Sequence, residues 1–177
     1  SSLGAYEMVV YDIPCCHHTT RSLEFDSQGR LYVQVGSGAN VDPDSTHARI
    51  QRFEVADLPQ EGLNWNIGEL FADGLRNEVG IRFDSYGQLW GVENGVDDLF
   101  RADLGGDIHN SNPCEEMNFF GVDGGQFYGY PYCWSSYNLT GYAPGTQFYQ
   151  PEFVAEYSDA WCQDTDNVTP PSMCMQA

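Results

Sequence analysis

The most reactive side chains near the start of the chain lie at Cys15-Cys16-His17-His18. Thiolates and imidazoles bind zinc, but structural zinc sites space their ligands by two or more residues. Neighbouring side chains of an extended segment also point to opposite faces. The pattern therefore favours disulfide-bonded cysteines, with one histidine in a functional or capping role, over a zinc site.

A guanidinium and an amide are adjacent at Arg76-Asn77, within a loop at residues 72–80. Such a pair can present charged and neutral donors to an anionic or carbonyl ligand. It also fits an ordinary surface loop, and the residues alone leave both interpretations open.

The segment at residues 92–98 places Glu93, Asp97 and Asp98 around a glycine. Calcium prefers carboxylate, amide and carbonyl oxygens, so this segment is a candidate calcium loop, although its spacing is not that of an EF-hand. A solvated acidic turn is the alternative. A second acidic segment, at residues 112–118, precedes a loop rich in glycine and tyrosine at residues 121–134, where turns and close backbone approach are expected.

The elements expected to position these residues are β-hairpins. Residues 23–33 and 81–91 match in Leu/Ile, Phe, Asp, Ser, Gly, Leu and an aromatic residue, with Phe25 and Phe83 in register. Apolar residues alternate on both sides of an Asp-Ser-x-Gly turn, which is typical of a hairpin with one buried face. A further strand is expected after each hairpin, at residues 50–55 and 99–104. Helical periodicity is nearly absent, so the predicted class is all-β.

A repeated four-stranded unit of this length is typical of a β-propeller blade. A β-sandwich with two similar hairpins is the alternative. Propellers close with about four to eight blades, whereas 177 residues supply about three. We therefore expect residues 1–177 to form one partial propeller domain, with a cysteine-bearing tail at residues 151–177.

The charge balance excludes some partners. All seven basic residues are arginine, and 26 acidic residues give a formal net charge of −19. Nucleic acid and anionic membrane surfaces both require clustered positive charge, so neither is an expected partner. No apolar run is long enough to span a membrane.

Six cysteines and two glycosylation sequons indicate an extracellular protein. The sequons begin at Asn138 and Asn167. The cysteines are all disulfide candidates, at Cys15, Cys16, Cys114, Cys133, Cys162 and Cys174. Six cysteines permit 15 connectivities, so the sequence leaves the pairing open. Cys114 with Cys133, which flank one Gly-rich loop, and Cys162 with Cys174 are the local predictions. No signal peptide precedes the chain, so a mature or trimmed secreted segment is expected.

The order of these clusters resembles that of the soluble quinoprotein sugar dehydrogenases. His18 precedes an Arg-x-Leu and the first hairpin, and Gly-x-Arg-Asn precedes the second. Glu-x-Gly, Asp-Asp, Glu-x-x-Asn and Tyr-Gly-aromatic-Pro follow in family order, as far as about Trp134. The family includes glucose, L-sorbosone and fungal-type pyranose dehydrogenases, and the later motifs are most similar to the fungal type. The resemblance implies a six-bladed propeller, of which this chain covers about three blades, with pyrroloquinoline quinone (PQQ) and calcium.

The resemblance also implies roles for individual residues. His18 would be the general base for the anomeric hydroxyl while a hydride passes from sugar C1 to the quinone. Arg76 would stabilise the charge that develops on the quinone oxygens, and Asn77 would hydrogen-bond the same cofactor. Carbonyls of Gly95 and Val96 would bind the calcium ion that anchors the quinone, so Gly95 also belongs to the cofactor site.

A second, structural calcium site is implied near Asp97 or Asp98, Glu116 and the Tyr128 carbonyl. His17 stands where the family often has an acid, so His17 and His18 remain alternative bases. The cationic cofactor ligands of later blades have no counterpart, which implies that the remaining blades or partner chains complete the site.

These residues and the resemblance leave two alternative functions. One is a secreted quinoprotein that oxidises a pyranose or aldose sugar and passes electrons to an acceptor. The other is a non-catalytic extracellular propeller that acts as a ligand-binding or structural assembly glycoprotein, since one fold hosts many functions.

Overall fold

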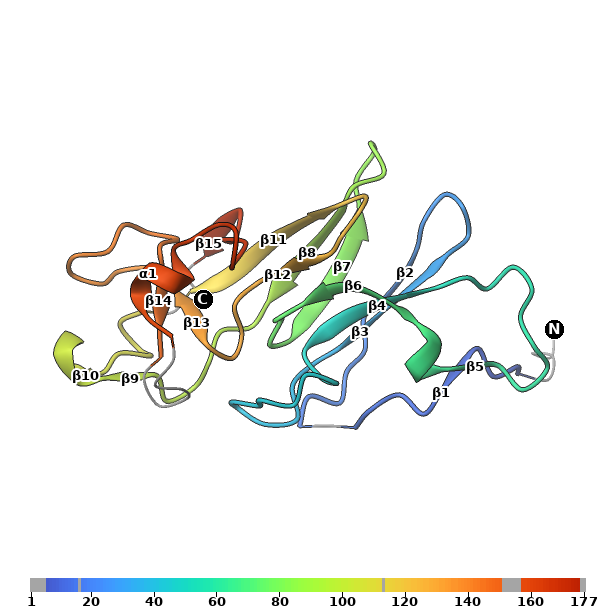
Figure 1. Cartoon of the computed structure of the whole chain (residues 1–177), viewed down its shortest axis with the longest axis horizontal. Helices are drawn as coiled ribbons and strands as arrows, with labels where there is room; N and C mark the ends of the chain where they lie inside the picture. The colour runs from blue at the N-terminus through green and yellow to red at the C-terminus, as the bar shows by residue number, and fades with distance from the viewer. Residues whose placement is uncertain (1–5, 16, 113, 151–156, 176–177) are drawn as a thin grey trace.

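The computed structural model describes residues 6–15, 17–112, 114–150 and 157–175. In this part of the chain the secondary structure is short β-strands with two 3₁₀ turns and one four-residue α-helix (Figure 1). The all-β prediction is confirmed at this level. No helix among the described residues is long and apolar enough to cross a membrane.

The first sheet has five strands in the order β12-β6-β4-β3-β2. Its bounds are β2 Leu23–Phe25, β3 Leu31–Val35, β4 Arg49–Phe53, β6 Glu69–Asp73 and β12 Gln126–Phe127. Strands β2, β3, β4 and β6 form an antiparallel meander, and β12 adds to β6 in parallel. The predicted hairpin at residues 23–33 and the strand that follows it are both confirmed.

The second sheet has four strands in the order β15-β11-β8-β7. Its bounds are β7 Glu78–Phe83, β8 Leu89–Glu93, β11 Glu115–Gly121 and β15 Met173–Met175. The hairpin at residues 81–91 is confirmed, but the strand expected at residues 99–104 is not. Only Phe100–Arg101 (β9) is extended there, and Ala102–Leu104 form the 3₁₀ helix η2. Gly105, at φ 110°, ends that turn and leads into β10 (Gly106–Asp107), so the third strand of the sheet is β11 instead.

Equivalent hydrogen bonds close the turns of the two hairpins. Asp26 Oδ1 accepts from the backbone N–H groups of Gln28 and Arg30, both at 2.9 Å. Asp84 Oδ1 accepts from those of residues 86 and 88, at 2.8 and 2.9 Å. In each turn a glycine with positive φ closes the loop, which is why the sequence repeats Asp-Ser-x-Gly.

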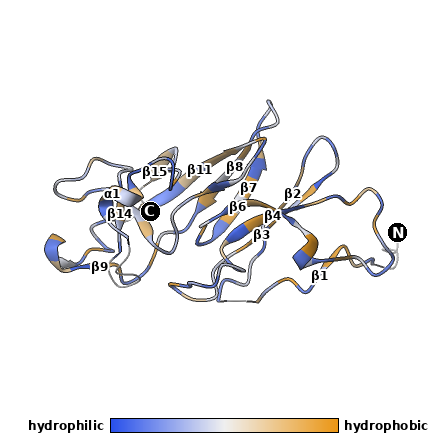
Figure 2. Ribbon diagram, in the orientation of Figure 1, coloured by the Kyte–Doolittle hydropathy of each residue, from blue (hydrophilic) through white to orange (hydrophobic). Residues whose placement is uncertain are grey.

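The main apolar core lies between the two sheets, which meet where β2 and β7 adjoin. Tyr32, Ile50 and Phe71 come from the first sheet, and Ile81, Leu89 and Phe120 from the second. The rings of Tyr32 and Phe71 pack edge to face with centroids 4.8 Å apart. Figure 2 shows hydrophobic and hydrophilic residues interspersed along the strands of both sheets. Strand β3 is buried on both faces, because its alternate residues Leu31, Val33 and Val35 pack in a second apolar cluster.

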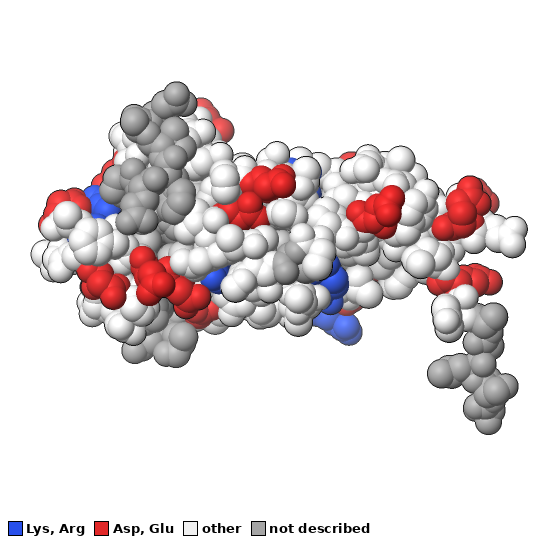
Figure 3. All heavy atoms as spheres, turned by 90° about the horizontal axis from the view of Figure 1, so that it is seen from below, with Lys and Arg blue, Asp and Glu red and all other residues white. Residues whose placement is uncertain are grey.

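A smaller unit follows the second sheet and contains β13 (Cys133–Ser135), β14 (Gln147–Tyr149) and α1 (Asp159–Cys162). At the opposite end of the chain β1 (Val10–Tyr11) pairs with β5 (Leu63–Asn64), which leads into the 3₁₀ helix η1 (Trp65–Ile67). Acidic side chains are spread over the face shown in Figure 3, among few arginines.

Two disulfide bonds hold this end of the molecule, and they contradict both local predictions. Cys114 pairs with Cys174, and Cys133 pairs with Cys162. Packing between segments that are distant in the sequence explains both pairings. Strand β15 returns beside β11 and places Cys174 opposite Glu116, two residues from Cys114. Helix α1 packs on β14, the partner of the strand that carries Cys133, so its last residue Cys162 reaches that strand. Cys16 lies outside the described residues.

Candidate functional site

His18 is held in one orientation by Ser37, two residues after the end of strand β3. Its Nδ1 lies 3.2 Å from the Ser37 carbonyl oxygen and 3.0 Å from the Ser37 hydroxyl. A carbonyl only accepts hydrogen bonds, so this contact favours the tautomer that carries its proton on Nδ1. Nε2 then keeps its lone pair and can accept a proton.

The surroundings of His18 also keep it neutral. Burial lowers the pKa of this imidazole, and the nearby positive charge of Arg76 lowers it further. Near pH 7 the side chain is therefore an uncharged base. Its neighbour His17 is exposed and contacts the His18 ring edge to face, with centroids 5.2 Å apart.

A close approach at Gly36 brings His18 together with the predicted pair Arg76-Asn77. A Cβ atom on Gly36 would lie 2.7 Å from the His18 Cβ and 2.6 Å from Asn77 Oδ1, so only glycine fits between them. The next residue, Ser37, donates its backbone N–H to the Arg76 carbonyl at 2.7 Å. The structure thus gathers residues that are about sixty positions apart in the chain.

Arg76 is buried, with 3% of its surface exposed, and its guanidinium bonds mainly to neutral oxygens. Nη1 donates to the Gly95 carbonyl at 2.6 Å, and Nη2 donates to Asn40 Oδ1 at 2.8 Å. The carboxylate paired with it is that of Asp97, at 3.5 Å, and that side chain is 78% exposed. The positive charge is therefore only weakly compensated, which is the arrangement expected of a site for an anionic ligand.

Asn77 completes this arrangement on its other side. Its Nδ2 donates to Asn94 Oδ1 at 2.9 Å, and its backbone carbonyl accepts from the Asn94 N–H at 3.1 Å. Asn94 precedes Gly95, so the predicted cofactor ligands Arg76, Asn77 and Gly95 form one hydrogen-bonded group.

A buried acidic network supports the backbone beneath Arg76. The Arg76 N–H donates to Glu93 Oε1, and Asn118 Nδ2 donates at 2.9 Å both to Glu93 Oε2 and to Glu78 Oε1. Burial raises the pKa of Glu78 to about 8. Burial and the negative charges of Glu116 and Glu78 raise that of Glu93. Near pH 7 this pair therefore holds at least one proton.

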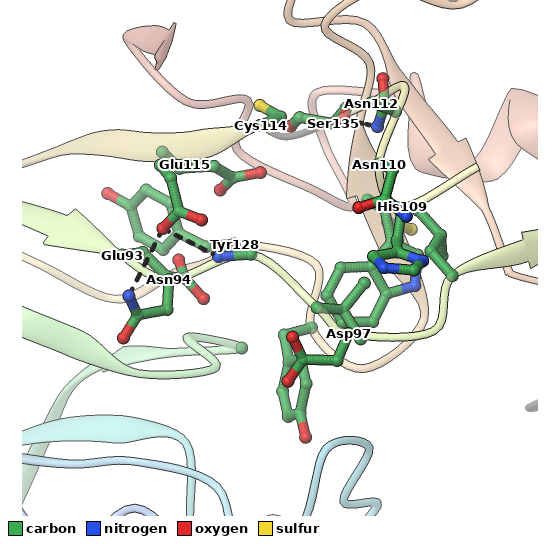
Figure 4. Close-up of a pocket in the computed structure, with 18 residues that line it drawn as sticks. Glu93, Asn94, Asp97, His109, Asn110, Asn112, Cys114, Glu115, Tyr128 and Ser135 are labelled. Carbon is green, nitrogen blue, oxygen red and sulfur yellow. Dashed lines mark hydrogen bonds between the residues drawn. The ribbon is translucent and has the colours of Figure 1, made fainter. Parts of the chain in front are cut away.

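A cavity of about 370 Å³ lies beside this group (Figure 4). Five of the six predicted metal positions line it, namely Gly95, Val96, Asp97, Glu116 and Tyr128. Asp98, the sixth, is exposed and does not. Glu93 and Glu115 add two carboxylates, and none of the lining residues is an arginine or lysine.

The turn at the cavity wall is fixed by Glu115, whose Oε2 accepts from the Gly95 N–H at 3.1 Å and from Asn94 Nδ2 at 3.4 Å (Figure 4). Burial raises the pKa of Glu116 to about 7. Among the described residues no group of three or more His, Cys, Asp and Glu side chains is placed to hold a metal ion together. A cation here would therefore depend on carbonyl and amide oxygens as well as carboxylates, a donor set that suits calcium.

Asn40 and Asn118 were not predicted as site residues, and Glu93 was expected only as part of a calcium loop, not as an acceptor for the Arg76 N–H. Asn118 does belong to the Glu-x-x-Asn motif, which was noted without a role for this residue. Asn40 contacts Asp97, 57 residues away, and no pattern in the sequence connects the two.

The two sequons differ in exposure. Asn138 is exposed, whereas Asn167 is partly buried and its Nδ2 lies 3.4 Å from the Trp161 carbonyl. An oligosaccharide therefore has freer access to Asn138.

Known proteins similar to this chain agree on one family. The TrAA12-like family model matches residues 2–177. The chain is 34% identical, over 96% of its length, to a pyrroloquinoline quinone-dependent sugar dehydrogenase of Hypocrea jecorina, and it spans 43% of that relative. A calcium structure of Trichoderma reesei Carbohydrate-Active Enzymes Family AA12 superposes with a TM-score of 0.86 at 33% identity, covering 97% of this chain and 46% of that one. The holo form of the pyranose dehydrogenase PQQ domain from Coprinopsis cinerea gives 0.83 at 29% identity, covering 94% and 44%.

Proposed function

The chain belongs to the TrAA12-like family, and from that premise we propose that it forms part of a secreted quinoprotein that oxidises a pyranose or aldose sugar. The observation that carries the proposal is the meeting of a neutral, oriented His18 with the weakly compensated Arg76 around Gly36 and Ser37. A base and a buried cation at one place suit removal of a proton from a substrate beside an electron-accepting cofactor.

Bound PQQ would supply the two-electron acceptor for oxidation at sugar C1. His18 Nε2 would accept the proton of the anomeric hydroxyl, because Nδ1 is engaged with Ser37. Arg76 would hold the anionic and carbonyl oxygens of the cofactor, and Asn77 would fix its orientation from the adjacent position. The uncharged state of His18 suits this role, since protonated imidazole accepts no proton.

Calcium fits the turn and cavity next to Arg76. The Gly95 carbonyl keeps one lone pair after accepting from Arg76, and the Val96 carbonyl follows it, so both could bind the ion that anchors the cofactor. Asp97, Glu116 and the Tyr128 carbonyl would serve a second ion in the cavity, with Asp98 at its edge.

In this proposal the two meander sheets and the unit after them are about three blades of a six-bladed propeller. The remaining blades or partner chains would supply further cationic ligands to the quinone. Two disulfide bonds and the exposed sequon at Asn138 support secretion.

The test adds PQQ and calcium to the complete gene product that contains these residues, and follows sugar-dependent reduction of a dye. We expect His18→Ala to lower kcat by about 10²- to 10⁴-fold, the usual contribution of a general base. The matched variant His17→Ala should retain activity, and both should bind the quinone. A wild-type protein that binds no quinone would refute the proposal, and equal loss in the two variants would refute the choice of base.

A further inference from the structure

Asn40 lies in the loop after β3 and bonds to both sides of the candidate site. Its Oδ1 accepts from Arg76 Nη2 at 2.8 Å and from the Asp97 N–H at 3.0 Å. Its Nδ2 donates to the Asp97 carbonyl at 2.6 Å. Its own backbone carbonyl accepts from Arg76 Nε at 3.2 Å. One half-buried side chain thus joins the guanidinium to the turn that follows Gly95.

We propose that Asn40 is a positioning residue that holds the Arg76 guanidinium and the Gly95–Asp97 turn in one fixed arrangement, and so sets the affinity for the cofactor. The inference rests on the proposed function, in which Arg76 binds the quinone and the Gly95 and Val96 carbonyls bind its calcium ion. Asn40 connects these two subsites from the loop after β3, in addition to the direct bond between Arg76 and the Gly95 carbonyl.

The amide group is required by the chemistry of its partners. Arg76 and the Asp97 N–H are donors, whereas the Asp97 carbonyl is an acceptor. An amide offers an acceptor and a donor on one plane, whereas a carboxylate offers acceptors only. Aspartate would keep two of the three side-chain bonds and would place an oxygen against the Asp97 carbonyl.

The loop that carries Asn40 is itself ordered by Asp42. Asp42 Oδ2 accepts from the Gly38 N–H at 2.5 Å and lies 2.7 Å from His47 Nδ1. Asp42 Oδ1 accepts from the Asp44 N–H at 2.9 Å. Tyr130 also approaches the Asn40 carbonyl, with its hydroxyl at 3.4 Å. Asn40 is thus presented on a rigid loop, which is what a positioning residue needs.

Without the Asn40 side chain, Arg76 Nη2 would lose its neutral partner, while Nη1 would keep the Gly95 carbonyl and Nε the backbone carbonyl of residue 40. The remaining partner of Nη2 would be the exposed Asp97 carboxylate at 3.5 Å. Arg76 would then swing toward that carboxylate, which would compensate its charge and compete with an anionic ligand. The Asp97 backbone would be released at the same time. The affinity for PQQ and the affinity for calcium should therefore fall together.

The experiment compares Asn40→Ala, Asn40→Asp and the wild type as the complete gene product, by titration of PQQ at fixed calcium and of calcium at fixed PQQ. Loss of the hydrogen bonds to a charged group should weaken PQQ binding by about 10- to 100-fold in Asn40→Ala. Asn40→Asp should bind PQQ no more tightly than Asn40→Ala, because its carboxylate would compensate the charge of Arg76 although two of the hydrogen bonds survive. Asn66→Ala, at an exposed position on η1, is the matched control and should bind like the wild type.

A second readout needs no cofactor. Amide hydrogen exchange at Asp97 should accelerate in Asn40→Ala but remain slow in Asn40→Asp, because Oδ1 still accepts from that N–H. Unchanged PQQ affinity, calcium affinity and Asp97 exchange in Asn40→Ala would overturn the inference. Failure of the wild type to bind PQQ, with Asp97 exchange still dependent on Asn40, would refute the proposed function instead and would leave the link between the two segments supported.

Discussion

His18 and Arg76 occupy equivalent positions ahead of the first hairpin of each sheet, yet one is a neutral base and the other a cation. Each lies 58 residues from the other, the same offset that relates Phe25 to Phe83. In the first sheet His18 Nδ1 contacts the Ser37 carbonyl at 3.2 Å. In the second, Arg76 Nη1 contacts the Gly95 carbonyl at 2.6 Å, and Gly95 is 58 residues after Ser37. The repeat therefore supplies a similar frame twice, in which a side chain reaches a carbonyl at the same offset. The backbone N–H groups differ, because that of His18 donates to the Ser37 carbonyl and that of Arg76 to the Glu93 carboxylate.

The residues that pack next to these two positions explain how the second sheet supports the buried guanidinium of Arg76. Glu78 and Glu93 stand where the first sheet has Thr20 and Val35, again at the same offset. Thr20 is exposed and Val35 is fully buried in an apolar cluster. The second sheet instead buries two carboxyl groups, which Asn118 bridges and one of which holds the Arg76 N–H. The two hairpin units thus differ chemically because Glu78 and Glu93 in the second replace Thr20 and Val35 in the first.

Removal of the Arg76 charge should have the greatest effect on this difference between the two hairpins. Arg76→Gln should weaken PQQ binding by about 100-fold or more, because it removes a buried, hydrogen-bonded charge. Titration of the protein with PQQ measures this. Arg82→Gln is the control, since that side chain is 83% exposed and should behave like the wild type. Equal affinities in the two variants would contradict the role of Arg76.

The acidic network should contribute to stability in the second sheet. Asn118→Ala removes the one amide that donates to both Glu78 and Glu93, so the free energy of unfolding should fall by about 2–4 kcal/mol. Urea denaturation measures the change. Asn66→Ala, at an exposed asparagine, should cost less than about 0.5 kcal/mol. A cost for Asn118→Ala no greater than that of the control would show that the network is not stabilising.

The raised pKa of Glu78 predicts a pH dependence of stability. Its folded-state pKa of about 8 exceeds the ordinary value of 4.5. A group raised in this way favours folding while it is protonated, so its contribution is complete below pH 4.5 and is lost as the pH rises through 8. The loss should be on the order of a few kcal/mol.

The matched variant is Glu78→Gln, which keeps the shape of the side chain and removes the titration. Thermal unfolding between pH 5 and 9 should show the wild type losing stability toward alkaline pH and the variant losing less. Parallel curves for the two proteins would mean that Glu78 ionises in the folded state at little cost.

The smallest effects test the symmetry of the hairpin turns. Gly29 and Gly87 have φ of 83° and 77°, and open space surrounds the position that a Cβ would take on each. Gly29→Ala and Gly87→Ala should therefore each cost about 1–2 kcal/mol, for backbone reasons alone. Chemical denaturation measures both costs. A difference of more than about 1 kcal/mol between them would show that the turns are not equivalent.

Much of the fold follows from local patterns that the chain repeats. Alternation around Asp-Ser-x-Gly predicts both hairpins, because the aspartate bonds to the turn and the glycine adopts the positive φ it needs. The strand expected at residues 99–104 failed because Gly105 and Gly106 both adopt positive φ and turn the chain back on itself after a 3₁₀ helix. Alternation alone gives no sign of which glycines will do so.

Site residues that are adjacent in the sequence could be predicted from it. Contacts between site residues that are distant in the sequence could not. Arg76-Asn77 and Gly95-Val96 each carry a local signal. Their contact with one another is made across two sheet strands, and Asn40 joins them from a third segment. The disulfide bonds show the same limit. Proximity in sequence favoured short loops, whereas the return of β15 beside β11 selected Cys114 and Cys174.

The all-β class, the two hairpins, the acidic character and the residue types available for chemistry all follow from the amino-acid sequence. These depend on side-chain alternation, turn geometry and composition, which act over a few residues. The folded structure is needed to show that His18 faces Ser37 and that Arg76 is buried with a weakly compensated charge. It is also needed to show that Asn40 bonds to both Arg76 and Asp97. Those outcomes depend on packing between segments about sixty residues apart, because burial and hydrogen-bond partners exist only once the sheets have met.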